Sequence, residues 1–154
     1  MVHATAIGGE RMTRVNTYLN FPGQTEEAFT HYRELFGTEF VGPIFRFGDM
    51  TLPDGTALSK EDANKIMHME VGIAAGHVLM ATDMLSSMGP ECRVGNNTTI
   101  MVECDTREEV DRLYKGLAAG TEESAPADQP WGQYWSVCLD KYGIRWMIAT
   151  PMGA

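Results

Sequence analysis

The stretch TEEAFTHYRELFG at residues 25–37 predicts an amphipathic helix, and the rest of the sequence is arranged around it. Its apolar residues recur at three- and four-residue steps, as on one face of a helix. Glu26 and Glu27 lie in the first turn, where negative charge favours a helix N-terminus, and Thr25 is available as the cap. Gly37 is a typical residue at which such a helix ends.

Strands are expected on both sides of this helix. The segment VNTYLNF at 15–21 mixes β-branched and aromatic residues and stops at a Pro-Gly turn, and residues 39–47 predict a second strand. Two apolar runs, 66–74 and 77–83, are joined by an Ala-Gly pair of the length of a tight hairpin turn. This half therefore reads strand, helix, strand, strand, strand.

The same order returns in the second half of the chain. A strand at 98–104 and a helix at 106–118 precede a Pro-rich loop around 125–131 and strands at 134–139 and 144–150. A shift of 82 residues places Glu26, Glu27, Tyr32 and Leu35 on the identical residues Glu108, Glu109, Tyr114 and Leu117. The repeat predicts one domain, 13–154, of two similar modules at about 13–90 and 96–154.

Composition and charge exclude several classes of protein. A chain of 154 residues with 44% apolar and 21% charged residues is of ordinary globular type. Its formal charge of −9 is repelled by nucleic-acid phosphates and by anionic lipid. The longest stretch without Asp, Glu, Lys or Arg, Val71 to Thr82, is shorter than the ~20 apolar residues of a membrane span. We expect no nucleic-acid partner and no membrane partner.

Two segments are expected to lie outside the regular elements. Residues 1–12 lack the pattern of a secretory signal, so we expect a disordered leader, with Met12 as an alternative start. Residues 48–65 form a long polar segment with Pro53 and the turn pair Asp54-Gly55. Long loops in compact domains are usually functional or mobile, so this segment is a candidate lid.

The cysteines predict neither a disulfide framework nor a zinc site. Cys92, Cys104 and Cys138 are an odd number in no metal-ligand spacing, which fits a reducing cytoplasm. Cys104 and Cys138 lie on predicted strands without a neighbouring histidine. They are better interpreted as small buried hydrophobes than as reactive thiols.

The common cofactor and hydrolase motifs are missing from the sequence. It contains no G-x-G-x-x-G, no phosphate-binding Gly-rich loop with Lys, no G-x-S-x-G and no H-E-x-x-H. Of its four histidines, His3 lies in the leader, His31 is expected to be solvated, and His77 is expected at the surface after a turn glycine. His68 remains as the histidine of interest.

His68 and Glu70 are two residues apart on a predicted strand, so their side chains share a face. An imidazole beside a carboxylate could orient a ligand or move a proton. An ordinary polar face is the alternative, since the intervening residues supply an apolar face to pack under a helix. Asp83, which closes the next strand, could receive donor groups of a ligand or serve as a turn residue.

Five large aromatic residues gather near the C-terminus, and they could line a small-molecule pocket or form core. They are Trp131, Tyr134, Trp135, Tyr142 and Trp146. Eleven methionines suit either an adaptable pocket or a loosely specified core. The sequence leaves both interpretations open.

The whole pattern resembles the vicinal oxygen chelate superfamily, which includes glyoxalase I, bleomycin-resistance proteins and extradiol dioxygenases, and within it the PhnB-like branch. The matching residues are Tyr18-Leu19-Asn20-Phe21 with Gly23, Glu27-Ala28-Phe29, YRELFG at 32–37, Met67-His68 with Glu70, LMATD at 79–83, and Trp131-Gly132 with DKYGIRWM at 140–147. The resemblance implies an α+β fold of two tandem βαβββ modules that curl into a half-barrel around a cavity, usually as a homodimer.

Metal-using relatives place His or Glu on the first and last strands of each half. The corresponding positions here are Asn16 or Thr17, Leu79 or Met80, Thr98 or Thr99, and Met147 or Ile148. Thioether and hydroxyl groups hold nickel, zinc or iron(II) far more weakly than imidazole and carboxylate do. The resemblance thus implies that the ancestral metal site is lost, and we expect no metal and no cofactor.

The resemblance further implies a cavity that binds a small organic molecule, with an acidic chain suited to a cationic guest. His68 and Glu70 are expected as polar contacts, and Tyr18, Met80, Trp135 and Trp146 as walls. One alternative is an enzyme: a metal-dependent lyase or dioxygenase with His68 and Glu70 as displaced ligands, or a metal-free isomerase that uses them as acid and base. Another is a protein whose dimer surface is its whole function.

Overall fold

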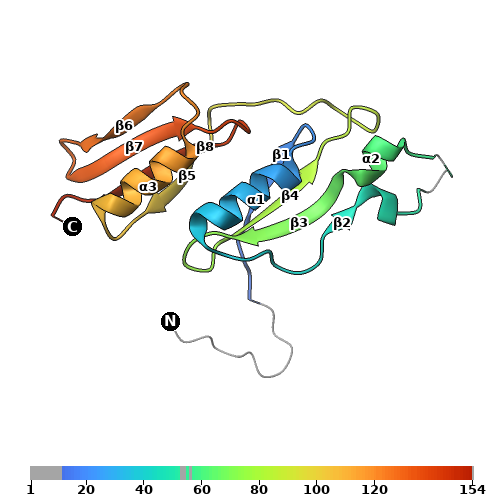
Figure 1. Ribbon diagram of the computed structural model, residues 1–154, viewed down its shortest axis with the longest axis horizontal. Coiled ribbons are helices and arrows are strands. Elements are labelled where there is room, and N and C mark those ends of the chain that lie inside the picture. The colour runs from blue at the N-terminus through green and yellow to red at the C-terminus, as the bar shows by residue number, and fades with distance from the viewer. Residues whose placement is uncertain (1–11, 53–54, 56, 154) are drawn as a thin grey trace.

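Two four-stranded sheets, each with one long helix, make up the computed structural model, which describes residues 12–52, 55 and 57–153 (Figure 1). The first half contains β1 (Thr17–Phe21), α1 (Thr25–Phe36), β2 (Phe45–Arg46), the short helices η1 (Phe47–Asp49) and α2 (Lys60–Asn64), β3 (Ile66–Gly72) and β4 (Val78–Asp83). The second half contains β5 (Ile100–Glu103), α3 (Arg107–Leu117), β6 (Ser124–Asp128), β7 (Gln133–Leu139) and β8 (Arg145–Pro151).

Both sheets have the same topology. Their strand orders are β1-β4-β3-β2 and β5-β8-β7-β6. In each sheet the first strand runs parallel to the last, and the other pairs are antiparallel. The predicted α+β fold of two βαβββ modules is therefore confirmed, and the two sheets remain separate rather than closing into one barrel.

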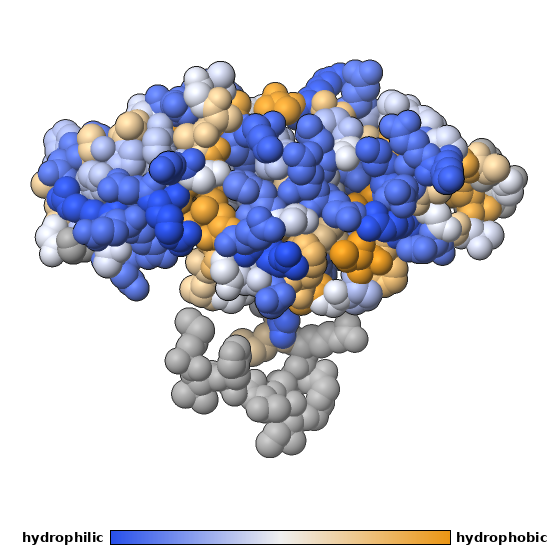
Figure 2. All heavy atoms as spheres, viewed as in Figure 1, coloured by the Kyte–Doolittle hydropathy of each residue, from blue (hydrophilic) through white to orange (hydrophobic). Residues whose placement is uncertain are grey.

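One face of each sheet packs under its helix. Helix α1 buries Ala28 and Phe29 on the side of the first sheet, and α3 buries Val110 and Leu113 against the second. Because side chains alternate along a strand, every second residue points to the face of the sheet opposite the helix. We call this face of each sheet its helix-free face. The surface seen in the view of Figure 1 is mainly hydrophilic, with small separate apolar patches (Figure 2).

A buried carboxylate accepts a hydrogen bond from the N-terminus of helix α1. The Oδ1 atom of Asp83 accepts a hydrogen bond from the backbone N–H of Thr25 (2.9 Å), and its Oδ2 accepts from the N–H of Ile66 (2.8 Å). The prediction that the Thr25 side chain caps the helix is therefore wrong, since Asp83 on β4 supplies the acceptor. The expected end is confirmed: Gly37 follows α1 with φ 65°, a left-handed conformation that glycine adopts without steric cost.

A second buried carboxylate joins the two halves. Asp140, 4% exposed in the turn between β7 and β8, accepts hydrogen bonds from the Tyr32 hydroxyl of α1 and from the Trp146 indole N–H (2.9 Å). It also accepts from the backbone N–H groups of Tyr142 (2.9 Å) and Ile144 (3.0 Å). Burial and the negative charge of Asp140 raise the pKa of Tyr32 well above its usual value, so the phenol remains a donor.

Helices α1 and α3 meet where α3 carries a glycine. A Cβ atom at Gly116 would lie 2.5 Å from Cδ1 of Leu35, so the contact depends on the missing side chain. His31 contacts the Gly116 carbonyl oxygen through Nε2 (2.7 Å), and Arg112 donates to the carbonyl of Leu35 (2.7 Å). The expectation of a solvated His31 is wrong, because this histidine bridges the two helices.

The structure corrects three further expectations. Residues within the Pro-rich loop at 125–131 belong to β6, an edge strand that tolerates Pro126 because its outer side needs no partner. The strand expected at 39–47 is reduced to β2 and an isolated bridge between Phe40 and Val71. The described part of 48–65 carries η1 and α2, while residues 53, 54 and 56 of the candidate lid and residues 1–11 of the expected leader lie outside the described residues.

Among the described residues, no helix is long and apolar enough to cross a membrane.

The first prediction concerns the carboxylate that joins the halves. Asp140→Asn should lower the free energy of unfolding by about 2–4 kcal/mol, because either orientation of the amide turns its NH2 group toward two buried donors. Urea unfolding followed by tryptophan fluorescence measures the change. Asp105→Asn, an exposed change of the same kind, should stay within about 0.5 kcal/mol of the parent. An Asp140→Asn protein as stable as the parent would contradict the role given to this residue.

Candidate functional site

Four of the six predicted site residues lie on the helix-free face of the first sheet. Met80 on β4 is paired with Tyr18 on β1 and with Glu70 on β3, so the three form one row across the sheet. His68 lies two residues before Glu70 on the same strand and shares this face. The two-residue spacing predicted the His68–Glu70 proximity, and the strand order β1-β4-β3 adds Tyr18.

Tyr18, His68 and Glu70 form a hydrogen-bonded chain. His68 Nε2 lies 3.0 Å from Oε1 of Glu70, and His68 Nδ1 lies 3.1 Å from the Tyr18 hydroxyl. A carboxylate only accepts hydrogen bonds, so the assignment that satisfies the chain puts the imidazole proton on Nε2. In neutral His68, Nδ1 is then an acceptor, and the Tyr18 hydroxyl donates to it. We call these three residues the polar chain.

The polar chain is accessible to solvent. Tyr18 is 48% exposed, and the side chains of His68 and Glu70 are 28% and 24% exposed. Desolvation of the hydroxyl and, to a smaller extent, the charge of Glu70 raise the pKa of Tyr18 above its usual value. Tyr18 is therefore a neutral phenol at neutral pH, suited to hydrogen bonding rather than to action as a phenolate.

The two predicted tryptophan walls lie elsewhere. Trp146 is fully buried in the core, where it donates to Asp140 and contacts Tyr32 ring to ring (5.3 Å between centroids), so it lines no open surface. Trp135 is half-buried on the helix-free face of the second sheet and makes an edge-to-face pair with Trp131 (5.5 Å). Because β7 and β3 lie on opposite sides of the molecule (Figure 1), Trp135 does not meet the polar chain within one chain.

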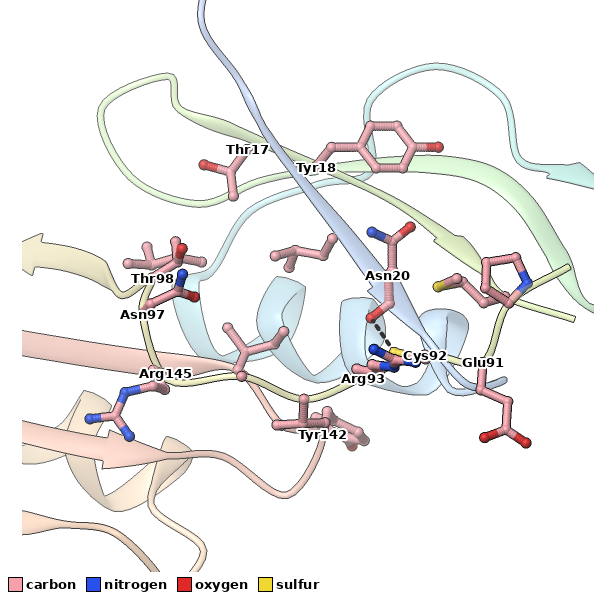
Figure 3. Close-up of a pocket in the computed structure, with 18 residues that line it drawn as sticks. Thr17, Tyr18, Asn20, Glu91, Cys92, Arg93, Asn97, Thr98, Tyr142 and Arg145 are labelled. Carbon is pink, nitrogen blue, oxygen red and sulfur yellow. Dashed lines mark hydrogen bonds between the residues drawn. The ribbon is translucent and has the colours of Figure 1, made fainter. Parts of the chain in front are cut away.

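A pocket of about 680 Å³ lies between the two halves (Figure 3). Its walls are β1, the linker between β4 and β5, and the turn before β8. Of the predicted site residues only Tyr18 lines it, and Figure 3 shows the Tyr18 ring directed away from the linker residues Cys92 and Arg93. Tyr18 therefore belongs both to the pocket wall and to the polar chain, whereas His68 and Glu70 do not line the pocket.

Sequence reasoning missed the polar wall of this pocket. The wall includes Asn20, Asn97, Arg93 and Arg145, together with Glu91. Arg145 occurs in the family-like block DKYGIRWM, which was the available signal, whereas the linker carries no motif. With two arginines and one glutamate, the wall is not acidic like the chain as a whole.

The positions that hold metal in related proteins do not fit a divalent transition metal here. Their side chains offer hydroxyl, amide, thioether and hydrocarbon groups, and Met80 and Met147 lie on the helix-free faces of different sheets. Among the described residues, no group of three or more His, Cys, Asp and Glu side chains is placed to hold a metal ion. The chemistry of this donor set supports no metal-dependent step.

The remaining candidates from the sequence have structural contacts. Nε2 of His77 lies 2.9 Å from the Thr17 hydroxyl, which ties the hairpin turn to β1. Asp83 is 2% exposed and engaged by backbone donors, close to the turn role expected for it. Burial is the main cause that raises the pKa of the Cys104 thiol to about 11 and that of Cys138 to about 12, so neither is a ready nucleophile.

The two βαβββ modules give this chain a glyoxalase-like fold. Residues 13–149 match the model of the family described as 3-demethylubiquinone-9 3-methyltransferase, and the chain belongs to this family. The description names a methyl transfer, but the sequence contains none of the Gly-rich nucleotide-binding motifs considered above.

Individual relatives agree with this assignment. The chain is 28% identical to Protein YjdN of Escherichia coli over 143 residues, which cover 87% of this chain and 92% of YjdN. It is similar to the crystal structure of protein PA1353 from Pseudomonas aeruginosa, with a TM-score of 0.74, 25% identity and coverage of 91% and 98% of the two chains. A glyoxalase/bleomycin resistance protein/dioxygenase from Nocardioides shares the fold, with a TM-score of 0.51, 17% identity and coverage of 94% and 87%.

Thiol reactivity tests the burial of the cysteines. At pH 8, iodoacetamide should modify Cys92, which is half-buried, well before Cys104 or Cys138, because thiols with a pKa of about 11 and about 12 form little thiolate at that pH. Peptide mass spectrometry measures the order of modification, and unfolding in urea should make all three react. Early labelling of Cys138 in the native protein would refute the expectation.

Proposed function

We propose that this protein binds a small organic molecule on the helix-free face of the first sheet, without a metal ion. The polar chain of Tyr18, His68 and Glu70 carries the proposal, because none of these three side chains is needed to close a core. Met80 and Phe45 add apolar surface beside them on β4 and β2. Binding sites of this kind combine apolar walls with a few fixed polar groups.

Retention of the molecule, rather than its conversion, is the function that this arrangement supports best. The raised pKa of Tyr18 keeps its hydroxyl protonated, and the donor set at the family's metal positions is weak. A binding protein of the bleomycin-resistance type needs only a fitting surface. Three free cysteines, two of them buried, suit the reducing cytoplasm that we propose as its location.

A homodimer completes the proposal. Tyr18, Phe45 and Met101 are 48%, 42% and 41% exposed on the two helix-free faces, and exposed large apolar side chains favour association. The second copy would lay the helix-free face of its second sheet over the first sheet. Such an arrangement would bring the Trp135 region of one copy to the polar chain of the other, which a single chain does not achieve.

Removal of the polar chain tests the binding site. His68→Ala with Glu70→Ala should leave the melting temperature nearly unchanged, because both side chains are partly exposed, and should weaken binding at least tenfold for fragments identified by ligand-observed NMR on the parent protein. The pair Glu34→Ala with Glu108→Ala, both on exposed helix positions, is the matched control and should bind as the parent does. Unchanged affinity in the His68→Ala, Glu70→Ala variant would show that the binding site does not lie on this face.

The dimer has a separate test. Analytical ultracentrifugation should give twice the chain mass of 17.0 kDa for the parent protein. Met101→Lys should shift the species toward 17.0 kDa, because it places a charge on the face that we expect to be covered. Met88→Lys changes a methionine of similar exposure in the linker, 48% against 41% for Met101, and should leave the parent mass unchanged. A monomeric parent would exclude the dimer.

A further inference from the structure

The polar chain leaves hydrogen-bond acceptors, and no donors, free to face a ligand. His68 donates through Nε2 to Glu70, and its Nδ1 receives the single hydroxyl proton of Tyr18. The free positions are therefore the lone pairs of the Tyr18 oxygen and the remaining acceptor sites of the Glu70 carboxylate. Among the described residues, Glu70 receives one side-chain hydrogen bond, from His68. A ligand that satisfies this surface must bring donors of its own.

Among the described residues, no lysine or arginine forms an ion pair with Glu70. The neighbouring strands contribute Tyr18 and Asn20 from β1, Val78, Met80 and Thr82 from β4, and Phe45 from β2. Arg46 is engaged by Glu26 (2.6 Å) and Lys65 by the carbonyl of Gly23 (3.3 Å). In the proposed dimer the covering face brings Glu103 and Arg145, and Arg145 is paired with Glu122 of its own chain (2.8 Å).

We infer that the molecule bound by this face is an organic cation with N–H donors, such as an ammonium or an amidinium. The inference rests on the proposed function and specifies its ligand class. Glu70 would accept a charge-assisted hydrogen bond, and the Tyr18 oxygen would accept a second one. The exposed rings of Tyr18 and Phe45 offer aromatic faces on which a cation can rest.

Three probes of equal size separate charge from shape: benzamidinium, benzamide and benzoate, measured by ligand-observed NMR at pH 8 on the full chain. Benzamidinium should bind at least tenfold more tightly than benzamide, and benzoate should bind most weakly. Glu70→Gln should reduce the affinity for benzamidinium about tenfold or more and leave benzamide nearly unchanged, since only the charge-assisted bond is lost. Glu108→Gln, the same change on the exposed side of α3, should change neither value.

A further measurement does not depend on the folding of the Glu70 variant. Tyr18→Phe should weaken benzamidinium severalfold, because it removes the oxygen that accepts the second hydrogen bond. Benzoate binding as tightly as benzamidinium, or a benzamidinium preference that persists in Glu70→Gln, would overturn the inference while the proposed function stands. Absence of binding by all three probes to the parent protein would overturn the inference together with the proposed function.

Discussion

The carboxylate of Asp140 determines how the two halves of this protein meet. A buried negative charge is tolerated only where donors surround it, and Asp140 has four: the Tyr32 hydroxyl, the Trp146 indole and two backbone N–H groups. One of these donors comes from the first module and the others from the second. Together with the contact of α1 and α3 at Gly116, this carboxylate joins the two modules.

Asp83 plays the matching part inside the first half. By accepting from the first residue of α1 and the first residue of β3, it sets the helix and the strand against β4. The resulting register places Tyr18, Met80 and Glu70 in one row. The polar chain thus depends on a residue that touches none of its members. Asp83 is the last residue of β4, and Asp140 directly follows the last residue of β7.

The sequence predicted those features that depend on local periodicity. A two-residue spacing was enough to place His68 beside Glu70, and helical spacing found α1 and α3. The contact of Tyr18 with His68 needed the strand order, which spacing does not contain. Trp146 was misplaced because an alternating strand fits either face, and only the position of α1 decides between them. The groups that donate hydrogen bonds to Asp83 and Asp140 come from distant segments, so no local sequence pattern indicates these contacts.

The close crossing of α1 and α3 at Gly116 has a consequence for the geometry of the whole molecule. Leu35 fills the space that a side chain at position 116 would need, so substituents of increasing size there would act as a graded wedge between the modules. Alanine, serine and valine at this position would push Leu35 and α1 away from α3 by successive steps, at a point outside both helix-free faces. The distance between the two modules could thereby be changed without changing any residue of the polar chain.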